Sequence, residues 1–185
     1  MDKYKLIEKQ IDNLTKKAAY RIEYSHSHSV LEWILKLKPK ADISLKIAAL
    51  GHDIDRCIEP ITNKKDFDNY DLYKKFHASR SAKIIVELMK KLDFDKKKID
   101  KTKFLIENHE IGGKGDAEIL KEADSLSFFE NNLKHYIEIN PYYVKDKIRF
   151  MYSRLSKKAR KLVLKVNFEN EKIRETVEEA ILDIK

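Results

Sequence analysis

Residues 47–56 read IAALGHDIDR, and this segment decides how the rest of the chain can fold. Its first four residues are apolar and suit a buried helix, and an imidazole and a carboxylate follow side by side at His52 and Asp53. Burying an unpaired charge is costly, and both side chains are good ligands for divalent transition metals. We therefore expect a helix whose C-terminal end carries two metal ligands into the core.

The composition favours long helices and few turns. Only 4 Gly and 3 Pro occur among the 185 residues, a length that fits one compact domain. No apolar run is long enough to cross a membrane, and nothing resembles a secretory signal. The one cysteine, Cys57, cannot form an internal disulfide and fits a reducing compartment. We expect an all-α protein of the cytoplasm that has no membrane partner.

Apolar residues at helical spacing predict where the helices lie. They are expected over residues 3–22 (with Ala18 as an inward position), over a segment that ends before Pro39, and over residues 43–56, 71–92, 96–109, 116–131, 144–155, 159–166 and 169–184. Asp42 is the expected N-cap of the third helix. The polar run 62–69 reads as a loop that can cover a cleft. The helices after Pro141 are expected to complete the core or to contact another subunit, which leaves a homo-oligomer open.

Four further polar side chains occupy positions where the helical pattern asks for an apolar residue: His26, His77, His109 and Asp124. His26 shares a face with the apolar residues of its helix, whereas His28 points elsewhere. A single inward histidine is usually a hydrogen-bonded core residue. Several of them with two carboxylates are better explained by one bound cation. The ligands are nitrogen and oxygen only, which disfavours a structural zinc site and suits Mn, Fe, Co, Ni, Zn or Mg.

The ordered set from His26 to Asp124, H…HD…H…H…D, resembles the HD-domain superfamily of metal-dependent phosphohydrolases. The resemblance covers about residues 20–130. It implies an HD-domain-like helical bundle over residues 1–185, in which additional helices in residues 141–185 follow the motif-bearing core. The resemblance also assigns the ligands. The first metal ion is held by His26, His52, Asp53 and Asp124. In members with two ions, His77 and His109 bind the second ion and Asp53 bridges, whereas in members with one ion these histidines face the substrate phosphate.

Two positions after the His-Asp pair depart from the common family motif His-Asp-Ile-Gly-Lys. Asp55 stands for the Gly and adds negative charge, and Arg56 stands for the Lys. Arg56 is a predicted catalytic residue because a guanidinium can clamp a phosphate through two hydrogen bonds. Asp53 is the other, because it would hold the metal and orient or deprotonate the attacking water. Arg56 is also a predicted substrate-binding residue, together with Glu110 and Lys114 beside the Gly112-Gly113 turn.

These assignments predict that the protein hydrolyses a phosphate ester or anhydride of a nucleotide or another small metabolite. The attacking water would be activated by one or two divalent ions. An HD-type di-iron oxygenase with the same ligands is one alternative. A non-catalytic, metal-containing module that binds nucleic acid is another. The net charge of +8 favours an anionic partner. However, the lysines are scattered. The nearest approach to a basic aromatic cluster is Tyr142-Tyr143 with Lys145 and Lys147, and it reads as helix-start packing.

Overall fold

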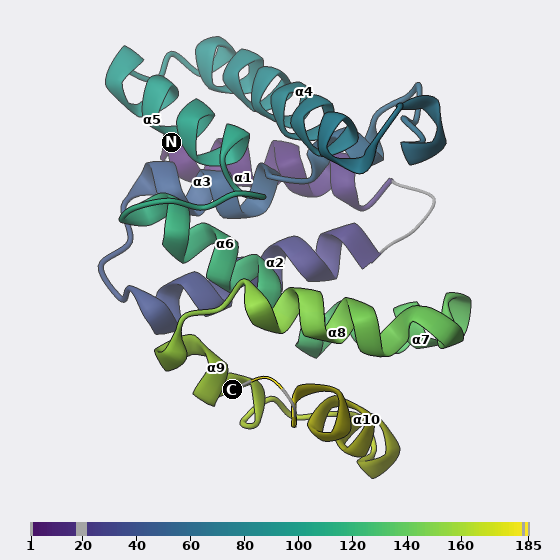
Figure 1. The fold of residues 1–185 in the computed structure, drawn as a ribbon. Helices are drawn as coiled ribbons and strands as arrows, with labels where there is room; N and C mark the ends of the chain where they lie inside the picture. Colours follow the sequence, from purple (N-terminus) through teal and green to yellow (C-terminus); the bar gives the residue numbers. More distant parts are fainter. Residues whose placement is uncertain (1, 18–21, 183, 185) are drawn as a thin grey trace.

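The computed structural model describes residues 2–17, 22–182 and 184, and all regular secondary structure in these ranges is helical, as the sequence predicts (Figure 1). The α-helices are α1 (Lys3–Thr15), α2 (Ile22–Leu37), α3 (Ile43–Gly51), α4 (Tyr70–Lys91), α5 (Lys96–Glu107), α6 (Asp116–Ser127), α7 (Leu133–Ile139), α8 (Val144–Ser153), α9 (Lys157–Val163) and α10 (Glu171–Ile181). Short 3₁₀ turns are η1 (Ile54–Cys57), η2 (Lys64–Asp66) and η4 (Pro141–Tyr143), and η3 (Phe128–Asn132) is a π-helical turn.

The predicted N-cap of the third helix is confirmed. The carboxylate of Asp42 accepts the amide N–H of Leu45 at 3.0 Å, which satisfies one of the free donors at the start of α3. Asn69, Asp95 and Asn170 cap α4, α5 and α10 in the same way.

The first and third predicted helices end well before their expected ends. The first ends at Thr15, and the expected inward position Ala18 lies outside the described residues. The third was expected to run to Arg56, but α3 ends at Gly51 and a 3₁₀ turn follows. The amide of Asp55 donates to the hydroxyl of Ser81 at 3.2 Å instead of bonding within a helix. A side-chain acceptor on another helix therefore draws the backbone out of α-helical geometry.

The predicted helix 116–131 is also divided differently. α6 ends at Ser127, and the π-turn η3 joins it to α7, so helical structure continues to Ile139. The last two predicted helices, 159–166 and 169–184, are observed as the shorter α9 and α10. The side chain of Ser156 caps α9, which begins at Lys157, two residues before the expected start.

Helices far apart in the sequence form one packed body (Figure 1). α4 packs on α5, α3 packs on α2 and α5, and α2 packs on α6. The C-terminal helices join them because α8 and α9 contact α6 and α8 also packs on α10, so buried apolar side chains from Ile7 to Ala180 belong to one core. Gly51 permits the close contact of α3 with α4, since a Cβ there would lie 2.4 Å from Cδ1 of Ile85.

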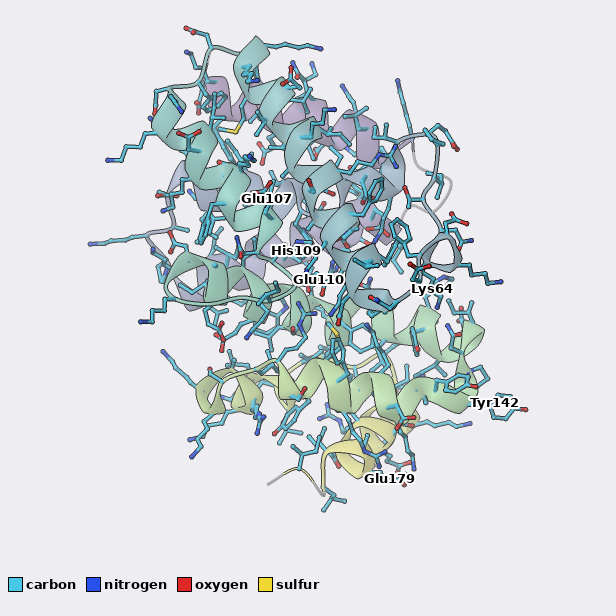
Figure 2. The ribbon with its side chains drawn as sticks, turned by 45° about the horizontal axis from the view of Figure 1, so that its top comes forward. Lys64, Glu107, His109, Glu110, Tyr142 and Glu179 are labelled. Atoms are coloured by element: carbon cyan, nitrogen blue, oxygen red, sulfur yellow. The ribbon has the colours of Figure 1, made fainter. Side chains whose placement is uncertain are left out.

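Tyr142 does not pack as the sequence suggests. Its side chain is 93% exposed and points away from the body at the edge near α7, and Tyr143 is 65% exposed (Figure 2). By contrast, His109 and Glu110 lie in the interior of the view, between α5 and the layer formed by α8. No helix within the described ranges has both the length and the apolar character needed to cross a membrane.

Candidate metal centre

The six predicted ligand residues converge in the interior as two neighbouring groups. His26 from α2, His52 after α3 and Asp124 from α6 form the first group. Asp53, His77 from α4 and His109 after α5 form the second. Within each group, the candidate ligand atoms all lie within 4.8 Å of one another, and all six residues are buried. Each group could hold a metal ion.

The end of α3 separates its two ligands. His52 still has helical backbone angles (φ −60°, ψ −34°), whereas Asp53 has left them (φ −108°, ψ 14°). Because the backbone changes direction between the two residues, their side chains can serve different groups although they are adjacent in sequence.

A hydrogen bond at Nδ1 orients three of the four histidines. Nδ1 of His52 donates to the carbonyl of Ala49 at 2.9 Å, and Nδ1 of His109 donates to the carbonyl of Ile106 at 2.7 Å. For His26, Nδ1 lies 2.9 Å from the hydroxyl of Ser127, which itself donates to the carbonyl of His26. These contacts place the proton on Nδ1 and turn the Nε2 lone pair towards the centre of the site.

His77 is oriented by a carboxylate. Its Nδ1 lies 2.5 Å from Oδ1 of Asp55, and its Nε2 lies 2.7 Å from Oδ1 of Asp53. Asp55 was expected to add negative charge next to the His-Asp pair. Its side chain is instead buried behind His77 and does not line the cavity. A carboxylate behind a metal-binding histidine is a common way of fixing the ring and raising its basicity.

The two oxygens of Asp53 face different groups. Oδ1 lies 3.5 Å from Nε2 of His109, in addition to its contact with His77, whereas Oδ2 lies 3.7 Å from Nε2 of His52 and 3.9 Å from Nε2 of His26. Oδ1 of Asp124 completes the first group at 3.3 Å from Nε2 of His26. Metal–ligand bonds of about 2.1 Å place neighbouring donors roughly 3.0–3.5 Å apart, close to these separations.

The charges in the site also favour a cation. Burial lowers the pKa of His52 to about 4, so its ring is neutral near pH 7, and its buried Nε2 has no hydrogen-bond partner among the described residues. At His77, burial alone would lower the pKa, but the charge of Asp53 raises it to about 9. A position that holds an extra proton this strongly also stabilises a metal cation. The residues present therefore fit a divalent ion.

Both carboxylate ligands also pair with an arginine. Arg56 pairs with Oδ2 of Asp53 and lies 3.7 Å from Oε1 of Glu23. Arg154 lies 3.0 Å from Oδ2 of Asp124. Burial alone would raise the pKa of both aspartates, but the charges of Arg56 and Arg154 hold them below the usual range.

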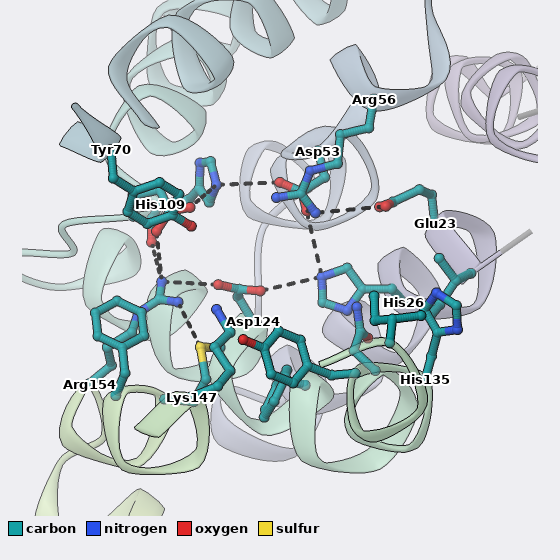
Figure 3. Close-up of a pocket in the computed structure, with 18 residues that line it drawn as sticks. Glu23, His26, Asp53, Arg56, Tyr70, His109, Asp124, His135, Lys147 and Arg154 are labelled. Atoms are coloured by element: carbon teal, nitrogen blue, oxygen red, sulfur yellow. Dashed lines mark hydrogen bonds and ion pairs between the residues drawn. The ribbon is translucent and has the colours of Figure 1, made fainter. Parts of the chain in front are cut away.

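A cavity of about 470 Å³ opens onto these ligands (Figure 3). Two of the predicted substrate-binding residues, Glu110 and Arg56, line it, whereas Lys114 is exposed and outside the lining, so the structure does not bring this third residue to the site. The loop 62–69 also contributes nothing to the lining. Tyr70, at the start of α4, lies at the cavity instead.

Two functional candidates, Lys147 and Arg154, come from α8 and the turn after it, a region where only packing was expected. Arg154 is buried, and its Nε has no hydrogen-bond partner among the described residues. Lys147 faces the rings of Phe128 and Phe150 at 5.6 and 5.2 Å, and no described carboxylate lies within ion-pair distance of it. Lys147 was interpreted as part of helix-start packing. The spacing of seven residues places it on one helix face with Arg154, but α8 carries basic residues on several faces, so the pattern does not single out these two as cavity residues.

Residues 7–177 match the family described as "Domain of unknown function (DUF4202)". The chain belongs to this DUF4202 family. No curated protein and no solved structure matches it. The DUF4202 match spans every candidate ligand and both basic residues of the C-terminal segment, so the whole site lies within the family's extent.

Proposed function

We propose that this DUF4202 chain is a metal-dependent phosphohydrolase that acts on a small phosphorylated metabolite. One observation carries the proposal: of a buried set of six residues with nitrogen and oxygen donors, four line a cavity that Arg56, Lys147 and Arg154 also line. The ligand order and its helical setting agree with the HD-type resemblance of the sequence.

The charge balance of the cavity supports a phosphorylated substrate. Four acidic side chains (Glu23, Asp53, Glu110 and Asp124) and three basic ones line it, so the lining carries a net charge of −1 when all are ionised. One divalent ion would change this to +1, and two ions to +3. A positive cavity with low-dielectric walls attracts and binds a phosphate group. Bound cations would also give the cavity its selectivity for anions over neutral compounds.

His26, His52, Asp53 and Asp124 would hold one ion, and His77 and His109, together with Asp53, would hold a second. A divalent ion held here would supply Lewis acidity, which polarises a phosphoryl group and acidifies water. Mn, Fe, Co, Ni, Zn and Mg all suit these donors.

The chain's own side chains bind and orient the phosphoryl group. Arg56 pairs with Asp53 and Arg154 pairs with Asp124 (Figure 3). Each guanidinium has further N–H donors that can bond phosphoryl oxygens. Lys147 adds a third positive charge with no competing carboxylate. These groups stabilise the charge that develops on the phosphoryl oxygens as the ester bond breaks. Asp53 would orient or deprotonate the attacking water.

The test is a screen of phosphorylated metabolites with Mn²⁺, Co²⁺, Ni²⁺ or Mg²⁺, comparing the parent protein with Asp53→Ala. We expect turnover in the parent and its loss, by at least about a thousandfold, in the variant. Asp71→Ala is the matched control, because Asp71 is an exposed aspartate paired only with Lys74. Equal turnover in the parent and Asp53→Ala would contradict the proposal.

A further inference from the structure

The cavity continues past the metal ligands along one face of the segment formed by α6, η3 and α7. The lining residues Phe128, Asn132, Tyr136 and Ile139 follow Asp124 at steps of three or four residues, the spacing of a single helix face. At 1.5 Å per residue, this face extends about 20 Å from Asp124. A phosphoryl group bound beside the metal ligands would occupy only the inner end of this face.

The outer part of this face is mainly apolar and aromatic. Phe128 is buried, its ring lies 6.1 Å from that of Tyr136 in an edge-to-face arrangement, and Ile139 is 59% exposed at the outer end. Ile22 and Phe150 line the cavity from α2 and α8. Rings and aliphatic side chains on both sides of a cavity bind flat apolar groups by excluding water from them.

Asn132 gives an independent sign that this face binds a ligand. Its Oδ1 atom is buried and has no hydrogen-bond partner among the described residues. A buried acceptor without a donor is destabilising, and such cases in folded proteins need an explanation. Asn132 is the last residue of the π-helical turn η3, and π-turns often occur at functional sites. A ligand N–H or O–H would satisfy this oxygen.

We propose that Phe128, Asn132, Tyr136 and Ile139 form an organic-group subsite, and that the substrate is a phosphate ester whose organic group is flat and largely apolar, with one N–H or O–H donor for Asn132. The phosphoryl end of this assignment rests on the proposed function. The organic end rests on the lining of the cavity alone. Small polar esters, such as phosphorylated glycerol, would leave the outer face empty and bind more weakly.

The experiment compares two phosphonates, which contain a stable C–P bond, by calorimetry on the Mn²⁺-loaded protein. Phenylphosphonate should bind at least about tenfold more tightly than methylphosphonate, because only the ring buries apolar area on the subsite. Ile139→Asn should reduce this preference, and Tyr136→Ser should reduce it further. Ile61→Asn is the matched control, since Ile61 is similarly exposed (53%) but does not line the cavity.

The outcomes separate the subsite from the hydrolase. Equal affinity for the two phosphonates, binding of neither, or a preference that survives both variants would overturn the subsite. Selective binding of phenylphosphonate without turnover of any phosphate ester would support the subsite and contradict the hydrolase. Turnover of many esters without regard to their organic group would support the hydrolase and contradict the subsite.

Discussion

Nη2 of Arg154 lies 3.0 Å from Oδ2 of Asp124, and both side chains are largely buried. Asp124 belongs to α6, whereas Arg154 follows α8. Oδ1 of the same carboxylate faces His26 at 3.3 Å. Asp124 therefore divides its two oxygens between a permanent cation and the proposed metal group. The arginine keeps the carboxylate ionised, and so ready to bind metal, near neutral pH.

This relationship predicts the effect of Arg154→Met. In metal-free protein, the variant leaves a buried carboxylate without its partner, and we expect a loss of roughly 3–5 kcal/mol in the free energy of unfolding. Guanidinium denaturation measures it. Arg149→Met, which removes a partly exposed arginine that pairs with Asp146 and donates to the carbonyl of Ala180, should cost only about 1–2 kcal/mol. If the two variants were equally stable, the pairing of Arg154 with Asp124 would have no energetic importance.

Lys147→Met tests substrate binding without disturbing an ion pair. Methionine keeps the contact with Phe128 and Phe150 but removes the charge, so KM for a phosphate ester should rise about ten- to a hundredfold. Steady-state kinetics provide the measurement. Lys145→Met lies on the same helix but removes an exposed lysine that pairs with Glu179, and it should leave KM unchanged. An unchanged KM in Lys147→Met would exclude this lysine from substrate recognition.

Asp55→Asn tests the carboxylate behind His77. The amide is a weaker acceptor for Nδ1–H of the ring, so we expect the affinity of the second group for Mn²⁺ to fall about ten- to a hundredfold. Competition with a metal chelator measures the affinity. Asp100→Asn changes an exposed aspartate of α5 and serves as the control. If both variants bound Mn²⁺ like the parent protein, Asp55 would have no role in orienting a ligand.

Cys57 should react slowly with alkylating reagents. Burial raises the pKa of its thiol from 9.0 to about 12, so at pH 8 the reactive thiolate is roughly a thousandfold scarcer than for an unperturbed thiol. The rate of labelling by iodoacetamide, measured by mass spectrometry, should rise steeply when urea unfolds the protein. It should also rise about tenfold for each unit of pH above 8. Labelling at the same rate in folded and unfolded protein would contradict the raised pKa.

The sequence by itself determines the helical class and the identity of the proposed ligands. Few glycines and prolines, with apolar residues at helical spacing, leave no strand pattern to compete with helices. The same periodicity distinguishes His26, which joins a ligand group, from His28, whose Nε2 bonds Asp12 at 2.9 Å instead. These properties depend on neighbours within a turn or two of the same helix, so a local pattern reveals them.

Only the tertiary structure decides which charges surround the ligands. Lys147 and Arg154 reach the cavity because α8 packs on α6, and Lys114 stays outside although it follows His109 by only five residues. Asp55 turns from the cavity towards His77 because Ser81 of α4 bonds its backbone. Each of these outcomes depends on contact between helices distant in sequence. An exposed lysine and a cavity lysine look alike in a chain whose charges are spread over nearly every helix, and only long-range packing separates them.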